Sequence, residues 1–590
     1  MPLLSLCNDD LTVKYAHGEP KVKTELNIPA APQITPNDKE KYDAAKVAVS
    51  FFQESVNTSV DPCEDFYKYA CGKYQKASST ALTKEKAFFD ACVAATKDSD
   101  HNNQILISNN YLMKRVRKLA DYLGAEFTYA LGGRVDRLPN KVQLANALGY
   151  LSFDQNIQTL VTPLVDTYWP DPKKGYTMFL DQNTAYMSTD DDTRRVYLRS
   201  WNLRSIAELQ NQFGFVDWQT YMKMVPKVAQ DKVQSGDFRV SVMEPDQYAK
   251  MSRDYAGFDK EKLVNYLFMR LLLSNAQYLP TYASSFKDMP EEPLVLGRKR
   301  RNIHFSESNT LADTQANCAK VANELMMFAN GRVFVDYVYP DEKYRDLIRS
   351  SAGGVMHNII HAFQGMVDQL DWMSEATKRK AIEKSMNIIT NIAFPDWIMD
   401  NAKLDLYYKS ITFDPTKENY YDIWTKLTMF NIEVQYKHLT MATADYDEFF
   451  MPPGIVNAWY HPELNTITFP AGILRPPYFH PDWPASIKYG GIGLIAGHEL
   501  IHGFDDQGVQ WGPKGHISYP EKNCIGWMDE QSTKGFKRLA QCVIDEYSTF
   551  CPLDNRTYTP NCVNGAQTQG ENIADNGGAF RLIEFEFTRG

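Results

Sequence analysis

Two histidines and a glutamate lie close together in the segment Gly497-His498-Glu499-Leu500-Ile501-His502. On a helix, residues four apart share one face, so His498 and His502 can offer ring nitrogens to the same metal ion. Glu499 then lies beside the open metal position, where it can take a proton from water and pass it to a leaving amine. The spacing predicts amide hydrolysis assisted by one Zn²⁺ per chain. The alternative is a buried helix with two unrelated histidines.

A third ligand is expected, because zinc in a hydrolytic site usually takes three protein ligands and keeps a fourth position for water. Glu571 and Asp575 lie four residues apart on a predicted helix within residues 570–578. Glu571 could complete a site of two histidines and one glutamate, and Asp575 could accept the free ring N–H of a ligand histidine. Such a pair alone is most often a solvated helix face. Beside the first motif it favours a metal site.

These residues resemble the neprilysin and endothelin-converting-enzyme family of zinc endopeptidases. Residues 456–460 and 468–479 resemble the family's substrate-binding edge strand and the segment that leads into its zinc helix. Residues 61–72 resemble its N-terminal signature. Read from the residues, Asn457 can present its side-chain amide and Ala458 its backbone carbonyl to an extended peptide. The alternative is an ordinary strand rich in aromatic residues.

The resemblance also implies an apolar pocket for the residue that follows the cut bond. The positions that correspond to the pocket lining are Ile473, Tyr478, Leu494 and Ile495. Such a pocket would favour large hydrophobic side chains. The alternative assigns these residues to the core, and for Ile495 both interpretations stay open.

The resemblance implies a mainly α fold, a two-domain gluzincin-type metallopeptidase with a large helical cap domain over a thermolysin-like catalytic domain. We expect an N-terminal tail at residues 1–40, the cap domain at 41–420 and the catalytic domain at 421–590. An apolar stripe at Val355, Ile359, Phe363, Met366 and Leu370 predicts one cap helix. Another helix is expected from Ala376 towards Ile392, before Pro395 ends the run.

Composition narrows the class of protein and the compartment. The 590 residues contain 63 basic and 73 acidic side chains, a net charge of −10 that argues against a nucleic-acid binder. Neither a signal peptide nor a membrane anchor is visible in the sequence. Nine cysteines and the acceptor patterns at Asn57 and Asn555 favour an extracellular or cell-surface glycoprotein.

Disulfide pairing is expected from two sources. Cys551 and Cys562 are close enough in sequence to pair locally, and the resemblance pairs Cys92 with Cys318. The resemblance further implies that the family's C-terminal segment is missing here, with its oxyanion-stabilising histidine, its substrate-binding arginine and the cysteines that would pair with Cys63, Cys71 and Cys542.

Three functions therefore compete. The first is a zinc endopeptidase that cuts short peptides on the amino side of a hydrophobic residue. The second is a catalytically impaired, zinc-binding relative that acts as a peptide- or protein-binding module. A zinc aminopeptidase is disfavoured, because the chain has no Gly-x-Met-Glu-Asn stretch to hold the free amine of a substrate.

Overall fold

The computed structural model describes residues 80–97, 101–125, 135–181, 203–276, 311–414, 416–518, 525–551 and 562–588. The predicted tail, the 61–72 segment and both glycosylation patterns lie outside these residues. Within the described ranges, no helix is both long and apolar enough to cross a membrane.

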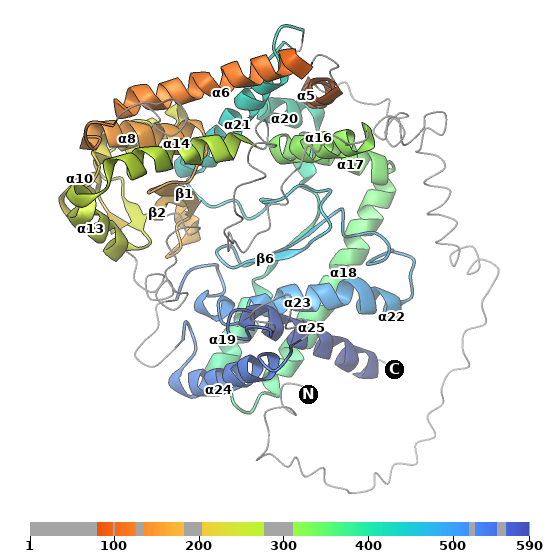
Figure 1. Ribbon diagram of the computed structural model, residues 1–590. Helices are drawn as coiled ribbons and strands as arrows, with labels where there is room; N and C mark the ends of the chain where they lie inside the picture. Colours follow the sequence, from red (N-terminus) through yellow and green to blue (C-terminus); the bar gives the residue numbers. More distant parts are fainter. Residues whose placement is uncertain are drawn as a thin grey trace, which may run out of the picture.

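Helices make up most of the described chain, which confirms the mainly α fold (Figure 1). The α-helices before residue 340 are α5 (Thr80–Lys97), α6 (His101–Leu123), α8 (Lys141–Gly149), α10 (Ile206–Gln212), α11 (Trp218–Met222), α12 (Lys227–Val233), α13 (Pro245–Asp254), α14 (Lys260–Ala276), α16 (Leu311–Leu325) and α17 (Met327–Val338). Those after it are α18 (Glu342–Asp368), α19 (Glu375–Met386), α20 (Asn401–Tyr407), α21 (Tyr420–Lys437), α22 (Ala485–Lys488), α23 (Leu494–His502), α24 (Glu530–Tyr547) and α25 (Gln569–Thr588).

The longest described helix, α18, joins the two parts of the molecule. It begins after Asp341, whose side chain caps the helix by accepting a hydrogen bond from the Tyr344 backbone N–H at 2.9 Å. Its predicted apolar stripe faces the core, with Val355, Ile359 and Phe363 buried. Figure 1 shows α18 descending from the upper layer of helices to α23 and α25, and it contacts both. The fold thus places a long helix behind the histidine motif.

Two small sheets accompany the helices. The strands are β1 (Thr162–Thr167), β2 (Tyr176–Asp181), β3 (Leu203–Arg204), β4 (Val240–Val242), β5 (Ile389–Ala393), β6 (Trp459–His461) and β7 (Thr466–Pro470). The first sheet has the order β1-β2-β4-β3 and the second the order β5-β7-β6. In the second, β5 runs parallel to β7, and β6 runs antiparallel to it with Trp459 opposite Thr468. Strand β6 therefore forms an edge of its sheet.

One predicted helix ends earlier than expected. Helix α19 stops at Met386, and residues 389–393 form β5 instead of continuing the helix towards Ile392. The prediction is wrong there because Ile389, Thr390 and Ile392 are β-branched and pair with residues of β7 that lie 77 positions further along the chain. Local periodicity does not report such a distant partner.

The boundary between the expected domains stays a prediction. Helices α18 and α19 and strand β5 precede residue 420, yet α18 contacts α23 and α25, and β5 pairs with β7. These contacts favour grouping residues 342–393 with the part of the molecule that carries the histidine motif.

Disulfides tie together distant and local segments. Cys92 is bonded to Cys318, 226 residues away, and Cys551 to Cys562. Both predicted pairs are therefore confirmed. Cys542 is disulfide-bonded as well, so the expectation that it would lack a partner is wrong. Covalent links of this kind restrict the unfolded chain and typically add about 2–4 kcal/mol each to stability.

Candidate metal centre

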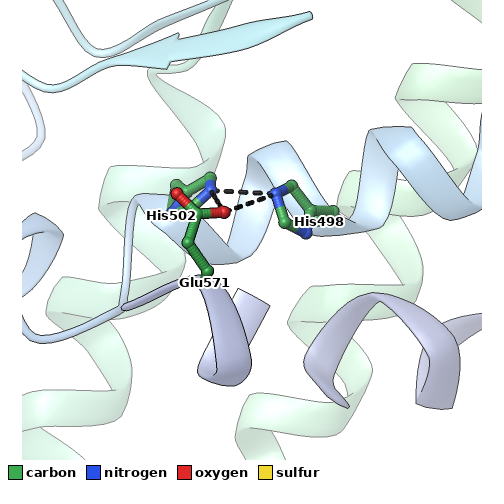
Figure 2. Close-up of side chains that lie close together, drawn as sticks. All are labelled: His498, His502 and Glu571. Atoms are coloured by element: carbon green, nitrogen blue, oxygen red, sulfur yellow. Dashed lines mark hydrogen bonds and ion pairs between the residues drawn. The ribbon is translucent and has the colours of Figure 1, made fainter. Parts of the chain in front are cut away.

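Three side chains from two helices converge at one point. His498 and His502 lie one turn apart on α23, and their Nε2 atoms are 3.0 Å apart. Glu571 of α25 places its Oε2 atom 3.4 Å from Nε2 of His498 and 3.5 Å from Nε2 of His502. Figure 2 shows the carboxylate pointing at both rings. The described part of the chain offers one such group of three candidate ligands.

The separations between these atoms match the needs of a zinc ion. Bonds of about 2.0–2.1 Å at tetrahedral angles place neighbouring ligand atoms about 3.3 Å apart. The three separations here lie between 3.0 and 3.5 Å. Two imidazoles and a carboxylate are also the donor set that hydrolytic zinc sites use. The residues therefore fit a zinc ion without rearrangement of the two helices.

Two aspartates face the Nδ1 atoms of the two histidines. Oδ1 of Asp575 lies 2.9 Å from Nδ1 of His498, and Oδ2 of Asp505 lies 2.8 Å from Nδ1 of His502. A carboxylate facing Nδ1 keeps the proton on that nitrogen and leaves Nε2 for a metal. Sequence reasoning anticipated Asp575 but missed Asp505. Its position three residues after His502 was the available signal.

The close approach of α23 and α25 depends on glycines. A side chain at Gly578 would place its Cβ 2.8 Å from the backbone nitrogen of His498, and one at Gly497 would meet the Gly578 Cα at 3.0 Å. Ala496 and Leu500 bury the opposite side of α23 in the core. The helices can therefore pack backbone to backbone, which brings Glu571 within reach of the histidines.

Replacing Gly578 by alanine should push the two helices apart. Because the new methyl group would meet backbone atoms of His498, we expect the free energy of unfolding to fall by about 1–3 kcal/mol and zinc affinity to fall with it. Gly353→Ala in α18 is the matched control, since a Cβ there meets open space and should slightly stabilise the helix. Denaturant unfolding and zinc titration measure both effects. Unchanged zinc affinity in Gly578→Ala would contradict this account of helix spacing.

Strong charge coupling links the three candidate ligands. Hydrogen bonds from His498 and His502 hold the pKa of the Glu571 carboxyl far below its usual range. Burial lowers the pKa of His502, but hydrogen bonds to Asp505 and Glu571 outweigh it and raise the pKa to about 10. Because a metal ligand histidine must be neutral at the nitrogen that binds, zinc affinity at such a site depends on pH.

Glu499 is more deeply buried than the three candidate ligands. Its side chain is only 6% exposed and accepts a hydrogen bond from the backbone N–H of Tyr460 in β6. Burial raises the pKa of the Glu499 carboxyl, although the nearby His502 and His498 oppose this. A raised pKa suits a group that must both take and return a proton near neutral pH. The hydrogen bond also ties this glutamate to the edge strand.

The residues expected to contact substrate lie in different environments. Asn457 is exposed and Ala458 is buried, and both directly precede β6. Ile473 is buried and belongs to the main core, and Ile495 is half-buried and packs against it. Tyr478 and Leu494 are each more than a third exposed. The carbonyl of Tyr478 accepts a hydrogen bond from the Ile492 backbone N–H at 2.8 Å, which places Tyr478 beside the entry into α23.

Two models of peptidase family M13 match residues 177–395 and 457–584, together more than half of the chain. The chain belongs to peptidase family M13, which confirms the resemblance, and it is a metalloendopeptidase. Membership in this family also implies a metal cofactor.

Particular relatives agree with this assignment. Neprilysin-11 of Caenorhabditis elegans is 26% identical over 95% of this chain and 72% of its own length. An endothelin-converting enzyme homolog of Locusta migratoria is 26% identical over 89% of this chain and 78% of its own. Among solved structures, the zinc metalloprotease Zmp1 of Mycobacterium tuberculosis aligns with a TM-score of 0.62 and 20% identity, covering 91% of this chain and 86% of that one. This last likeness supports the two-domain metallopeptidase fold.

Proposed function

We propose that this metalloendopeptidase hydrolyses short peptides on the amino side of a large hydrophobic residue, with one Zn²⁺ held by His498, His502 and Glu571. The observation that supports it best is the set of separations among the three ligand atoms, 3.0, 3.4 and 3.5 Å. When bound, Zn²⁺ would supply a Lewis acid that polarises the attacking water and the scissile carbonyl.

The protein side chains perform the proton transfers and the positioning. Glu499 takes a proton from the attacking water and delivers it to the nitrogen of the leaving amine. Asp575 and Asp505 hold the rings of His498 and His502 in the tautomer that presents Nε2. These roles agree with the hydrogen bonds at Nδ1 and with the burial of Glu499 beside β6.

The substrate would add a strand beside β6. Asn457 and Ala458 would hold the peptide backbone in extended form, which the edge position of β6 favours. Tyr478 and Leu494 would contact the hydrophobic residue after the cut bond, with Ile473 and Ile495 supporting them from the core. The large helical cap would admit only small substrates to the site. Glu499 argues against the alternative of a non-catalytic binding module, because a degenerate protease usually loses its base.

We further propose that the protein works outside the cell. The bonded pairs Cys92–Cys318 and Cys551–Cys562 support this, since disulfides persist in oxidising compartments. Such a setting also suits the proposed peptide substrates.

Hydrolysis of a quenched fluorescent peptide tests the proposal. The peptide is blocked at both ends and carries one internal Phe, and a matched peptide carries Asp at that position. We expect cleavage before Phe, loss of cleavage with a chelator, recovery on addition of zinc, and little cleavage of the Asp peptide. Cleavage that survives chelation would refute the metal mechanism. Stoichiometric zinc binding without any cleavage would instead support the non-catalytic alternative.

A further inference from the structure

A fully buried lysine lies behind the candidate metal site. Lys384 of α19 is 0% exposed, and its Nζ atom donates to the backbone carbonyls of Gly503, Gly508 and Trp511 at 2.6, 2.7 and 2.7 Å. Lysine is almost never fully buried unless it is paired, because removing an ammonium from water is costly. An ammonium has three N–H donors, and here each has a carbonyl acceptor.

The three carbonyls belong to the loop that directly follows the histidine helix. Helix α23 ends at His502, and the loop from residue 503 to residue 511 carries Asp505. Asp505 presents Oδ2 to Nδ1 of His502, while its Oδ1 accepts from the backbone N–H groups of Gln507 and Gly508 at 2.9 and 2.6 Å. Lys384 thus contacts the first residue of this loop, its middle and its last residue.

We propose that Lys384 is a positioning residue of the metal site, whose ammonium fixes the 503–511 loop so that Asp505 holds the His502 ring with Nε2 free for the metal. The inference rests on the function proposed above, since it assigns a role toward the same zinc site. Within the described part of the chain, Nζ of Lys384 hydrogen-bonds to backbone carbonyls of the loop and to none of the candidate ligands or Glu499.

Burial and polar contacts act on the charge of Lys384 in opposite directions. Burial lowers its pKa to about 7, and the Asp505 carboxylate opposes that effect. The rings of Tyr460 and Phe504 lie 5.6 and 5.4 Å from Nζ, within the range of cation–π attraction. The three carbonyl acceptors add charge-assisted hydrogen bonds, which are stronger than neutral ones.

A second contact anchors the helix that carries Lys384. The Asn465 side chain donates from Nδ2 to the carbonyls of Lys384 and Pro513, each at 3.1 Å, and accepts from the Tyr460 hydroxyl at 2.9 Å. Asn465 lies in the turn between β6 and β7, and Tyr460 lies in β6. The backbone carbonyl of Lys384 therefore binds the turn of the β5-β7-β6 sheet, while its ammonium binds the loop after α23. A loop hydrogen-bonded to one ammonium at three positions can keep Asp505 in register with His502.

Zinc affinity separates a positioning role from a merely structural one. Lys384→Met keeps much of the side-chain volume but removes the three donors, and we expect zinc affinity to fall about 10- to 100-fold, as when a partner of a ligand histidine is lost. Lys384→Arg keeps the charge in a planar geometry and should retain part of the affinity. Lys378→Met is the matched control, because Lys378 is a buried lysine of the same helix that donates to the Asp368 carbonyl at 2.8 Å.

Competition with a chromophoric chelator gives the zinc dissociation constants, and thermal unfolding reports the fold. A Lys384→Met variant that binds zinc as tightly as the unmodified chain, or a Lys378→Met variant that loses as much affinity, would overturn the proposal. If Lys384→Met does not fold, the comparison of Lys384→Arg with Lys378→Met decides in the same way. An unmodified chain that binds no zinc would instead refute the proposed function.

A double-mutant cycle tests the route through Asp505. Because Lys384 is proposed to act by placing this carboxylate, the effects of Lys384→Met and Asp505→Asn on zinc affinity should be non-additive. The double variant should bind zinc with about the same affinity as whichever of the two single variants binds it less tightly. Full additivity would show that Lys384 does not act through Asp505 and would overturn the inference.

Discussion

Replacing Glu499 by glutamine is expected to lower the rate of peptide hydrolysis by about 100- to 10,000-fold and to leave zinc binding intact. Glutamine keeps the shape and can still accept the hydrogen bond from Tyr460, but it cannot take a proton from water. Zinc content by metal analysis and turnover of the Phe peptide, measured on the same sample, check both halves of the result. The ligand set is unchanged, so the metal should stay.

A surface glutamate provides the control for this variant. Glu530 in α24 lies 3.0 Å from Lys534 and is more than half exposed, so Glu530→Gln should leave turnover unchanged. Turnover of Glu499→Gln close to that of the unmodified chain would contradict the assignment of the base. Loss of zinc from Glu499→Gln would show that this side chain also supports the metal.

Replacing Glu571 by alanine is expected to weaken zinc binding by more than about 100-fold. Glu571 is a proposed direct ligand, and loss of a residue that only hydrogen-bonds to a ligand already costs about 10- to 100-fold. Hydrolysis should disappear at ordinary zinc concentrations. The fold should survive, since the Glu571 side chain is 70% exposed and exposed substitutions usually change stability by about 0.5 kcal/mol or less. Zinc titration and thermal unfolding measure the two quantities separately.

Asp575→Asn supplies a graded comparison on the same helix. Asp575 contacts His498 Nδ1 rather than the proposed zinc position. The fall in zinc affinity of Asp575→Asn should therefore be about 10- to 100-fold and smaller than that of Glu571→Ala. An Asp575→Asn variant that binds zinc less tightly than Glu571→Ala would reverse the proposed roles. A Glu571→Ala variant with full affinity would show that α25 supplies no ligand.

The local arrangement of the candidate ligands was predictable because neighbouring residues of one helix encode it. The four-residue spacing of His498 and His502 places both rings on one helical face whatever lies around the helix. The same holds for Glu571 and Asp575 on α25 and for the apolar stripe of α18. Residues that share a face of one helix need no tertiary contact to be recognised. The matches to two models of peptidase family M13 confirmed the family resemblance, and the element order confirmed the mainly α fold.

Features that depend on distant segments were harder to predict. The sequence pattern continued α19 through residues 389–393, whereas pairing with β7 makes them a strand. Asp505 could be suspected from its spacing, but Lys384 carries no local signal, since it lies 119 residues before the first carbonyl that it contacts. An isolated lysine in a helical pattern is usually a solvated residue.

Residue types and their spacing were enough to identify which side chains could do chemistry and which helical faces they share. Whether the two helices meet depends on tertiary packing, and they meet because Gly497 and Gly578 let the backbones of α23 and α25 approach. It also placed Glu499 against β6 and closed the loop after His502 around Lys384. Helical periodicity is a property of neighbouring residues, whereas these contacts depend on how segments far apart in the chain pack together.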